Sequence, residues 1–149
     1  MSNVLHILID QAKEKADACL KAIASTQQKI GQAQEKRQML EDYANECQGS
    51  MHSRASSGIT GLQLRNQLAF AGKITQAIEQ QDAELSFLQS TLTHQQTQWQ
   101  AALAEQRKYE ALFEREKAKQ EKAQNKREQK MNDEFAARIH RVQTAGETT

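Results

Sequence analysis

The sequence predicts an all-α protein, a long antiparallel two-helix coiled coil whose second helix overhangs the first. The 149 residues include no proline and only six glycines, which favours long uninterrupted helices. Apolar residues make up only 38% of the chain and mean hydropathy is −0.83, which disfavours a thick globular core and a buried catalytic cleft. Apolar residues also recur at alternating spacings of three and four, as in coiled coils. We expect a single domain covering residues 1–149.

The first helix is expected over about residues 3–48. Along it, eleven of thirteen positions with coiled-coil spacing are apolar, and only Thr26 and Arg37 are not. The thirteen positions are 5, 9, 12, 16, 19, 23, 26, 30, 33, 37, 40, 44 and 47. They define a seam, the line of side chains along which one helix packs on another.

A connector rich in glycine and serine is expected over about residues 49–60. Gly49 suits the left-handed conformation that ends a helix. Thr60 and Gln63 have the spacing of a capping box, in which the two side chains satisfy backbone groups at a helix start. The second helix is therefore expected to begin at about residue 61.

The second helix is expected over about residues 61–143, with a short flexible C-terminus after it. Ten of its thirteen seam positions are apolar, namely all except 81, 95 and 106 among 71, 74, 78, 81, 85, 88, 92, 95, 99, 102, 106, 109 and 113. The stretch from Glu114 to Lys130 is charged and has no packing face. A short amphipathic end follows, with apolar residues spaced by 4, 4 and 3 at Met131, Phe135, Ile139 and Val142.

The position of the connector sets the predicted pairing between the helices. With the bend near residue 54, the first helix runs out of partner just past residue 104. Roughly residues 107–143 would then project as a single helix about 55 Å long. The same register places Arg37 opposite Gly72, where a glycine leaves room for the arginine side chain. The projecting helix has nothing to pack on, so we expect its order to depend on a partner.

The sequence offers no pattern of an active site, a metal site or a cofactor site, and we expect neither enzymatic activity nor a cofactor. None of the four histidines has a second histidine or a cysteine four residues later, and no phosphate-binding glycine loop is present. Cys19 and Cys47 are too far apart on one helix to form a disulfide, which is typical of a reduced, cytoplasmic protein. No segment has the length and apolarity of a membrane span, and none resembles a signal peptide.

The stretch 115–130 concentrates basic charge within a chain whose net charge is +1. Seven basic residues stand against three acidic ones, a net charge of about +4 for this stretch. A solvated helix face is one interpretation, and a docking surface for an acidic protein groove is another. Binding to nucleic acid is disfavoured because no aromatic residues interleave with the charges for stacking.

A second candidate surface lies along and beside the seam. Phe70 and Ala77 flank the seam positions Ile74 and Gln81 and form a stripe with them. Tyr43 lies outside the seam of the first helix, one turn from Leu40, and is expected close to Phe70. An exposed patch of this kind is typical of a partner site. Coverage of the seam by flanking residues is an equally simple interpretation.

Over nearly its full length the chain resembles the flagellar export protein FliJ family. The resemblance is carried by five segments: Leu5 with Leu8-Ile9-Asp10, Asp42-Tyr43-Ala44-Asn45-Glu46, Gly58-Ile59, the stretch 70–80 (FAGKITQAIEQ), and the stretch 130–138 (KMNDEFAAR). The connector and the ending near residue 138 are more specific than the coiled-coil spacing.

The resemblance implies a soluble, non-enzymatic component of the flagellar type III export apparatus. It implies a coiled coil similar to the central stalk of rotary ATPases, which sits in the hexameric export ATPase and promotes its assembly. Further implied partners are the membrane export gate and the export chaperones, which such a protein helps to recycle. The implied location is the cytoplasm, peripherally associated through partners with the cytoplasmic face of the inner membrane at the flagellar base.

The resemblance also implies candidate site residues. The surface of the family that contacts the gate matches Leu40, Tyr43, Phe70, Ile74, Ala77 and Gln81. Gln81 and Cys47 depart from the histidine and the aromatic residue expected at those positions. ATPase contact is expected where the N-terminus meets the C-terminal overhang, with candidates Arg115, Lys117, Lys119, Lys122, Lys126 and Arg127.

Two alternatives remain open from the sequence. One is the equivalent stalk protein of a virulence type III secretion system or of another rotary ATPase. The other belongs to a different class: a basic helix that binds nucleic acid or a membrane surface through the charged stretch 115–130.

Overall fold

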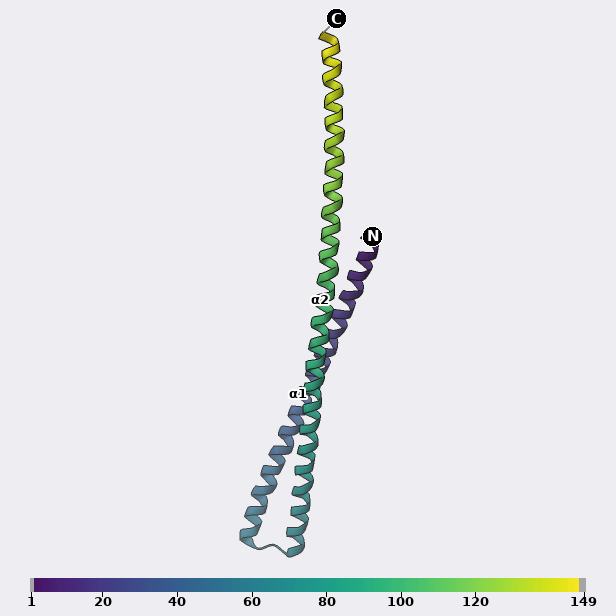
Figure 1. Ribbon diagram of the computed structural model, residues 1–149. Helices are drawn as coiled ribbons and strands as arrows, with labels where there is room; N and C mark the ends of the chain where they lie inside the picture. The colour runs from purple at the N-terminus through teal and green to yellow at the C-terminus, as the bar shows by residue number, and fades with distance from the viewer. Residues whose placement is uncertain (1, 148–149) are drawn as a thin grey trace. The chain divides into compact units, whose positions relative to one another are not determined.

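A computed structural model describes residues 2–147 of the chain as two helices and no strand (Figure 1). Helix α1 spans Ser2–Ser57 and helix α2 spans Gly61–Glu147, so the predicted all-α, two-helix coiled coil is confirmed. The chain divides into two compact units. The connector unit comprises residues 15–101, and the terminal unit comprises the described residues of 1–14 and 102–149. The single domain expected from the sequence stays a prediction.

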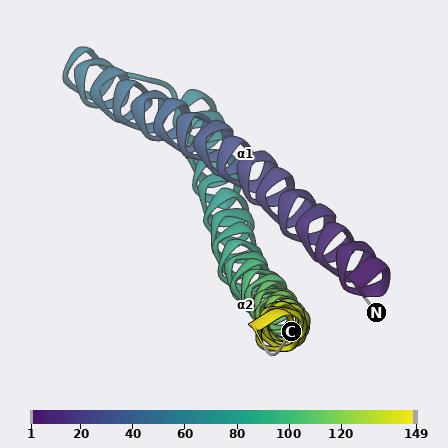
Figure 2. The ribbon, with the colours of Figure 1, turned by 90° about the horizontal axis from the view of Figure 1, so that it is seen from above.

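In the connector unit, α1 and α2 run in opposite directions and pack through the predicted seam (Figure 1). Every predicted seam position between residues 15 and 101 is buried or half-buried. The most deeply buried apolar side chains are Ala16, Ile23, Ala33, Ile74 and Leu88. Because two of these five are alanines, the interface is thin and buries little apolar area per turn. Figures 1 and 2 both show that the helices cross within this unit and separate toward the connector.

Two polar residues occupy buried seam positions of the connector unit. The Thr26 hydroxyl donates a hydrogen bond to the backbone carbonyl of Ala22 at 3.0 Å. The side-chain amide of Gln81 donates to a carboxylate oxygen of Glu84 at 3.3 Å. Both side chains find partners on their own helix, and this makes their burial tolerable.

The connector is shorter than the sequence predicted and lies later in the chain. Helix α1 does not end at residue 48 but continues to Ser57, and only residues 58–60 lie between the helices. Gly49 is helical, whereas Gly58 has a φ of 86° and supplies the left-handed conformation that ends α1. The Ser56 and Ser57 hydroxyls donate to the carbonyl oxygens of Ser53 and Arg54 in the last turn, at 2.7 and 3.1 Å.

The predicted capping box at the start of α2 is confirmed. The Thr60 hydroxyl accepts a hydrogen bond from the Gln63 backbone N–H at 3.2 Å, and the Gln63 side chain accepts one from the Thr60 backbone N–H at 3.3 Å. This reciprocal pair satisfies two backbone donors that have no partner within the helix. It explains why α2 begins at Gly61.

Moving the connector changes the register of the helices. Arg37 faces Asp82 rather than Gly72, which corrects the predicted pairing. A Cβ built on Gly72 would meet nothing within 4 Å, so this glycine does not make room for a side chain. The error follows from the expected bend near residue 54, because the observed connector is centred at residue 59.

In the terminal unit, the first turns of α1 pack on the segment of α2 that begins at residue 102. Ala12 and Ala102 are buried, with 4% and 2% of their surface exposed. The ring of His6 lies against that of Phe113, with centroids 4.7 Å apart. The last half-buried residue is Glu116, and every residue from 117 to 146 is exposed. The single helix therefore begins later than the predicted residue 107, and its length is about 45 Å.

The C-terminal end of α2 also differs from the prediction. Helix α2 continues to Glu147 rather than ending at about residue 143. The expected flexible C-terminus falls partly on residues 148–149, which lie outside the described residues. Neither helix, over residues 2–147, has a stretch long and apolar enough to span a membrane.

Candidate protein-binding site

Two aromatic side chains are partly exposed next to each other in the connector unit. Tyr43 of α1 is 54% exposed, and Phe70 of α2 is 46% exposed. Their ring centroids are 6.1 Å apart with an interplanar angle of 63°, an edge-to-face contact between the two helices. The sequence predicted this proximity, and the structure brings the two rings together.

The other residues of the predicted gate surface lie deeper. Ile74 and Gln81 are 6% and 9% exposed and belong to the interface between α1 and α2. Leu40 and Ala77 are half-buried. The predicted stripe is therefore divided. Tyr43 and Phe70 expose about half of their surface, whereas Ile74 and Gln81 mainly hold the two helices together.

An open groove of about 630 Å³ adjoins the two rings, on the side where α1 and α2 separate. Its lining residues are Tyr43, Ala44, Glu46, Cys47, Gln48, Ser50, Met51, Asn66, Gln67, Phe70, Ala71, Ile74 and Thr75. Small side chains at Ala44, Cys47 and Ala71 leave this space unfilled. Its volume falls in the range of sites that take an apolar group of a ligand or partner.

Sequence reasoning did not predict the groove, although Cys47 offered a signal. This small thiol stands where the family resemblance implies an aromatic residue, and it is half-buried and unpaired as a free cysteine. The groove also contains a polar atom that the sequence could not identify. The side-chain oxygen of Gln67 is buried without a hydrogen-bond partner among the described residues.

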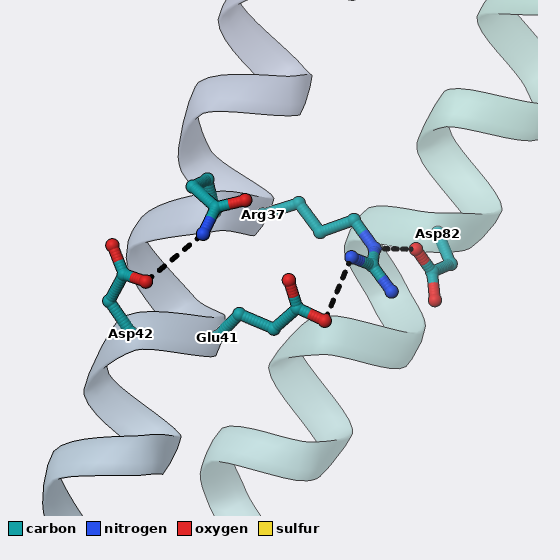
Figure 3. A network of polar contacts seen from close by, with 5 residues as sticks. Arg37, Glu41, Asp42 and Asp82 are labelled. Atoms are coloured by element: carbon teal, nitrogen blue, oxygen red, sulfur yellow. Dashed lines mark hydrogen bonds and ion pairs between the residues drawn. The ribbon is translucent and has the colours of Figure 1, made fainter.

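A polar network joins α1 to α2 within the connector unit (Figure 3). The Arg37 guanidinium donates to Asp82 of α2 at 2.5 Å and pairs with Glu41 of its own helix at 3.2 Å. The hydrogen bond to Asp82 is the main reason that the pKa of Arg37 lies above its usual value, and both carboxylates favour its charged form. Arg37 occupies a seam position, so this network fixes which turns of the helices face each other.

The candidate residues for ATPase contact all lie in the terminal unit. Arg115, Lys117, Lys119, Lys122, Lys126 and Arg127 are exposed, and no ion pair among the described residues involves them. All but Arg115 belong to the fully exposed part of α2, which begins at Lys117. The arrangement presents a helix of net charge about +4, which suits electrostatic docking onto an acidic surface.

Neither surface carries groups arranged for covalent or metal chemistry. No cluster of three histidine, cysteine or acidic side chains that could hold a metal ion occurs within the described part of the chain. Outside both surfaces, partial burial, aided by the neighbouring Glu105 carboxylate, raises the pKa of the Tyr109 phenol.

Comparison with known proteins identifies the family. The family model described as flagellar FliJ protein matches residues 1–145. The flagellar FliJ protein of Salmonella typhi is 27% identical over 134 residues, which cover 90% of this chain and 91% of that protein. That of Escherichia coli K12 is 28% identical over 134 residues with the same coverage. No solved structure matches the chain. The chain therefore belongs to the flagellar FliJ protein family, whose members are components of the flagellar export apparatus.

Proposed function

We propose that this protein acts as the central stalk-like coiled coil of the hexameric flagellar export ATPase, promotes that ATPase, contacts the membrane export gate and helps to recycle export chaperones. It acts without enzymatic activity of its own, at the cytoplasmic face of the inner membrane and held there by its partners. The proposal rests on one observation together with the family match. Every residue of α2 from 117 to 146 is exposed, so α1 does not pack on this part of the helix.

The charge of the exposed helix supports binding within a ring. A single helix at the centre of a sixfold ring must meet each subunit in a different orientation. Mixed and mainly basic side chains make contacts that are weak individually and easily exchanged. Residues 115–130 carry both signs, with a net charge of about +4, and residues 118–130 contain no large apolar side chain that would lock one orientation.

Charge reversal in the exposed helix tests the ATPase contact. The variant Lys119→Glu/Lys126→Glu is expected to lose comigration with the purified cognate ATPase in size-exclusion chromatography. The matched control, Lys21→Glu/Lys29→Glu, reverses two exposed charges on α1 and is expected to bind as the unchanged chain does. Equal binding by both variants would contradict the proposed contact. Comparable, salt-dependent binding to DNA would instead favour the nucleic-acid alternative.

A pair of phenylalanines on α2 tests the gate contact. Phe70→Ala is expected to weaken binding to the purified cytoplasmic part of the export gate by at least tenfold, because an exposed aromatic side chain is a common energetic centre of an interface. Phe87 is the matched control because it is 70% exposed on the same helix but lies outside the candidate surface. Phe87→Ala should leave gate binding unchanged, and an equal loss in both variants would contradict the proposal.

A further inference from the structure

The end of α2 carries an apolar stripe in the terminal unit. Met131, Phe135, Ile139 and Val142 are 67%, 64%, 43% and 72% exposed. Their spacings of 4, 4 and 3 place them on one face of the helix, within about 80° of each other around the axis. Such a face on a single helix indicates burial against another helix.

Charged residues beside the stripe follow an order that favours a particular occupant. Over residues 131–143, Glu134 comes first on one flank of the stripe, and Arg138 and Arg141 follow; Lys130 precedes them on the same side. Over the same residues, the other flank carries only uncharged residues, at Asn132, Ala136 and Gln143. No ion pair in the described part of the chain involves the three charged side chains. The charged flank thus has an acidic half and a basic half.

We propose that this stripe pairs with the same stripe of a second copy of the chain, in an antiparallel arrangement. In an antiparallel helix pair, the same flank of each helix faces its counterpart, with its direction reversed. Glu134 of one copy therefore lies near Arg138 and Arg141 of the other, and the twofold symmetry repeats this contact. Phe135 packs beside Ile139 of the second copy, and Met131 packs beside Val142.

The charges beyond the stripe also favour the antiparallel arrangement. When Phe135 of one copy faces Ile139 of the other, the helices overlap over about residues 128–146. The basic residues from Arg115 to Arg127 of the two copies then lie on opposite sides of the overlap, so these two basic stretches do not face each other. A parallel pair would place the two basic stretches side by side and would bring the charged flank against the uncharged one.

The length of the overlap sets the strength of the association. About 19 residues of helix span roughly 28 Å. Such a contact buries less than the roughly 800 Å² per partner that is typical of a stable complex. The association is therefore weak and concentration-dependent. The pairing can exist whether or not the proposed function is correct. It covers the stripe when no other protein is bound there.

Sedimentation of the full-length protein over a range of concentrations, at low salt, tests the pairing. We expect reversible dimer formation, with a dissociation constant raised at least tenfold by Ile139→Asn or by Glu134→Arg. Asp133→Arg is the matched control. It reverses a neighbouring charge on the helix face opposite the stripe and is expected to leave the dissociation constant unchanged. Circular dichroism verifies that each variant keeps its helix content.

A mixing experiment separates the proposed contact from a general loss of solubility or folding. Glu134→Arg and the variant Arg138→Glu/Arg141→Glu are each expected to dimerise poorly alone. Their equimolar mixture should dimerise at least as well as the unchanged chain, because opposite charges then face each other. A monomeric unchanged chain at all concentrations, equal effects of Glu134→Arg and Asp133→Arg, or a mixture that stays monomeric would each overturn the proposal.

Discussion

Replacing Ile74 by alanine is expected to destabilise the coiled coil more than replacing Phe70. Ile74 is 6% exposed between α1 and α2, and the loss of a buried isoleucine side chain costs about 2–3 kcal/mol at a site bordered by an open groove. Phe70 is 46% exposed, so much of its ring is already in water and its truncation costs about 1 kcal/mol. The two residues belong to one predicted surface but have different roles.

Thermal unfolding followed by circular dichroism at 222 nm measures this difference. For a chain of this size, 1 kcal/mol corresponds to about 2–4 °C in Tm. Ile74→Ala is therefore expected to lower Tm by roughly 5–10 °C, and Phe70→Ala by roughly 2–4 °C. A loss of gate binding by Ile74→Ala should recover on cooling, whereas that of Phe70→Ala should not. An equal or larger fall in Tm for Phe70→Ala would refute the placement of these side chains.

Three further predictions concern individual residues. Gly72→Ala is expected to raise stability by about 1 kcal/mol in thermal melts, because a Cβ meets nothing within 4 Å there. Thr60→Ala is expected to lower the stability of the folded protein by about 1 kcal/mol in the same assay, because the capping box is lost. Tyr109 favours the neutral phenol in the folded state, so the stability that it contributes is present at neutral pH and lost as pH rises through its raised pKa. In an alkaline titration followed by absorbance at 295 nm, the variant Tyr109→Phe should lack the step at the highest pH.

The seam could be predicted from the sequence because it depends on spacing alone. All twenty-six predicted positions, from residues 5 to 47 and 71 to 113, are buried or half-buried. Thr26 and Arg37 lie on the seam despite their polarity, since each finds a hydrogen-bond partner there. The last seam position, Phe113, lies close to the last half-buried residue, Glu116, although the assumed bend predicted that pairing ends just past residue 104.

The connector and the register could not be predicted as well. Glycines at positions 49 and 58 are equally able to end a helix, and the sequence does not show which one adopts the left-handed conformation. The structure selects Gly58, and this moves the partner of Arg37 from Gly72 to Asp82. When the register is inferred from an assumed bend, an error in the position of the bend shifts every predicted pair of facing residues.

The sequence predicted that Tyr43 and Phe70 lie close together, but not the shape of the surface around them. Spacing placed Phe70 beside the seam and Tyr43 near it, and their contact is observed. The groove beside them depends on how far α1 and α2 separate toward the connector and on the small side chain of Cys47. Backbone separation leaves no mark on residue spacing, so the sequence could not show it.

ATP hydrolysis by the purified cognate flagellar export ATPase, measured with and without this protein, tests the stalk role most directly. The account predicts a higher hydrolysis rate together with formation of a hexameric ring in size-exclusion chromatography. Lys119→Glu/Lys126→Glu should fail to produce either effect, whereas Phe70→Ala should produce both. An unchanged rate with no ring in the presence of the unchanged chain would contradict the account.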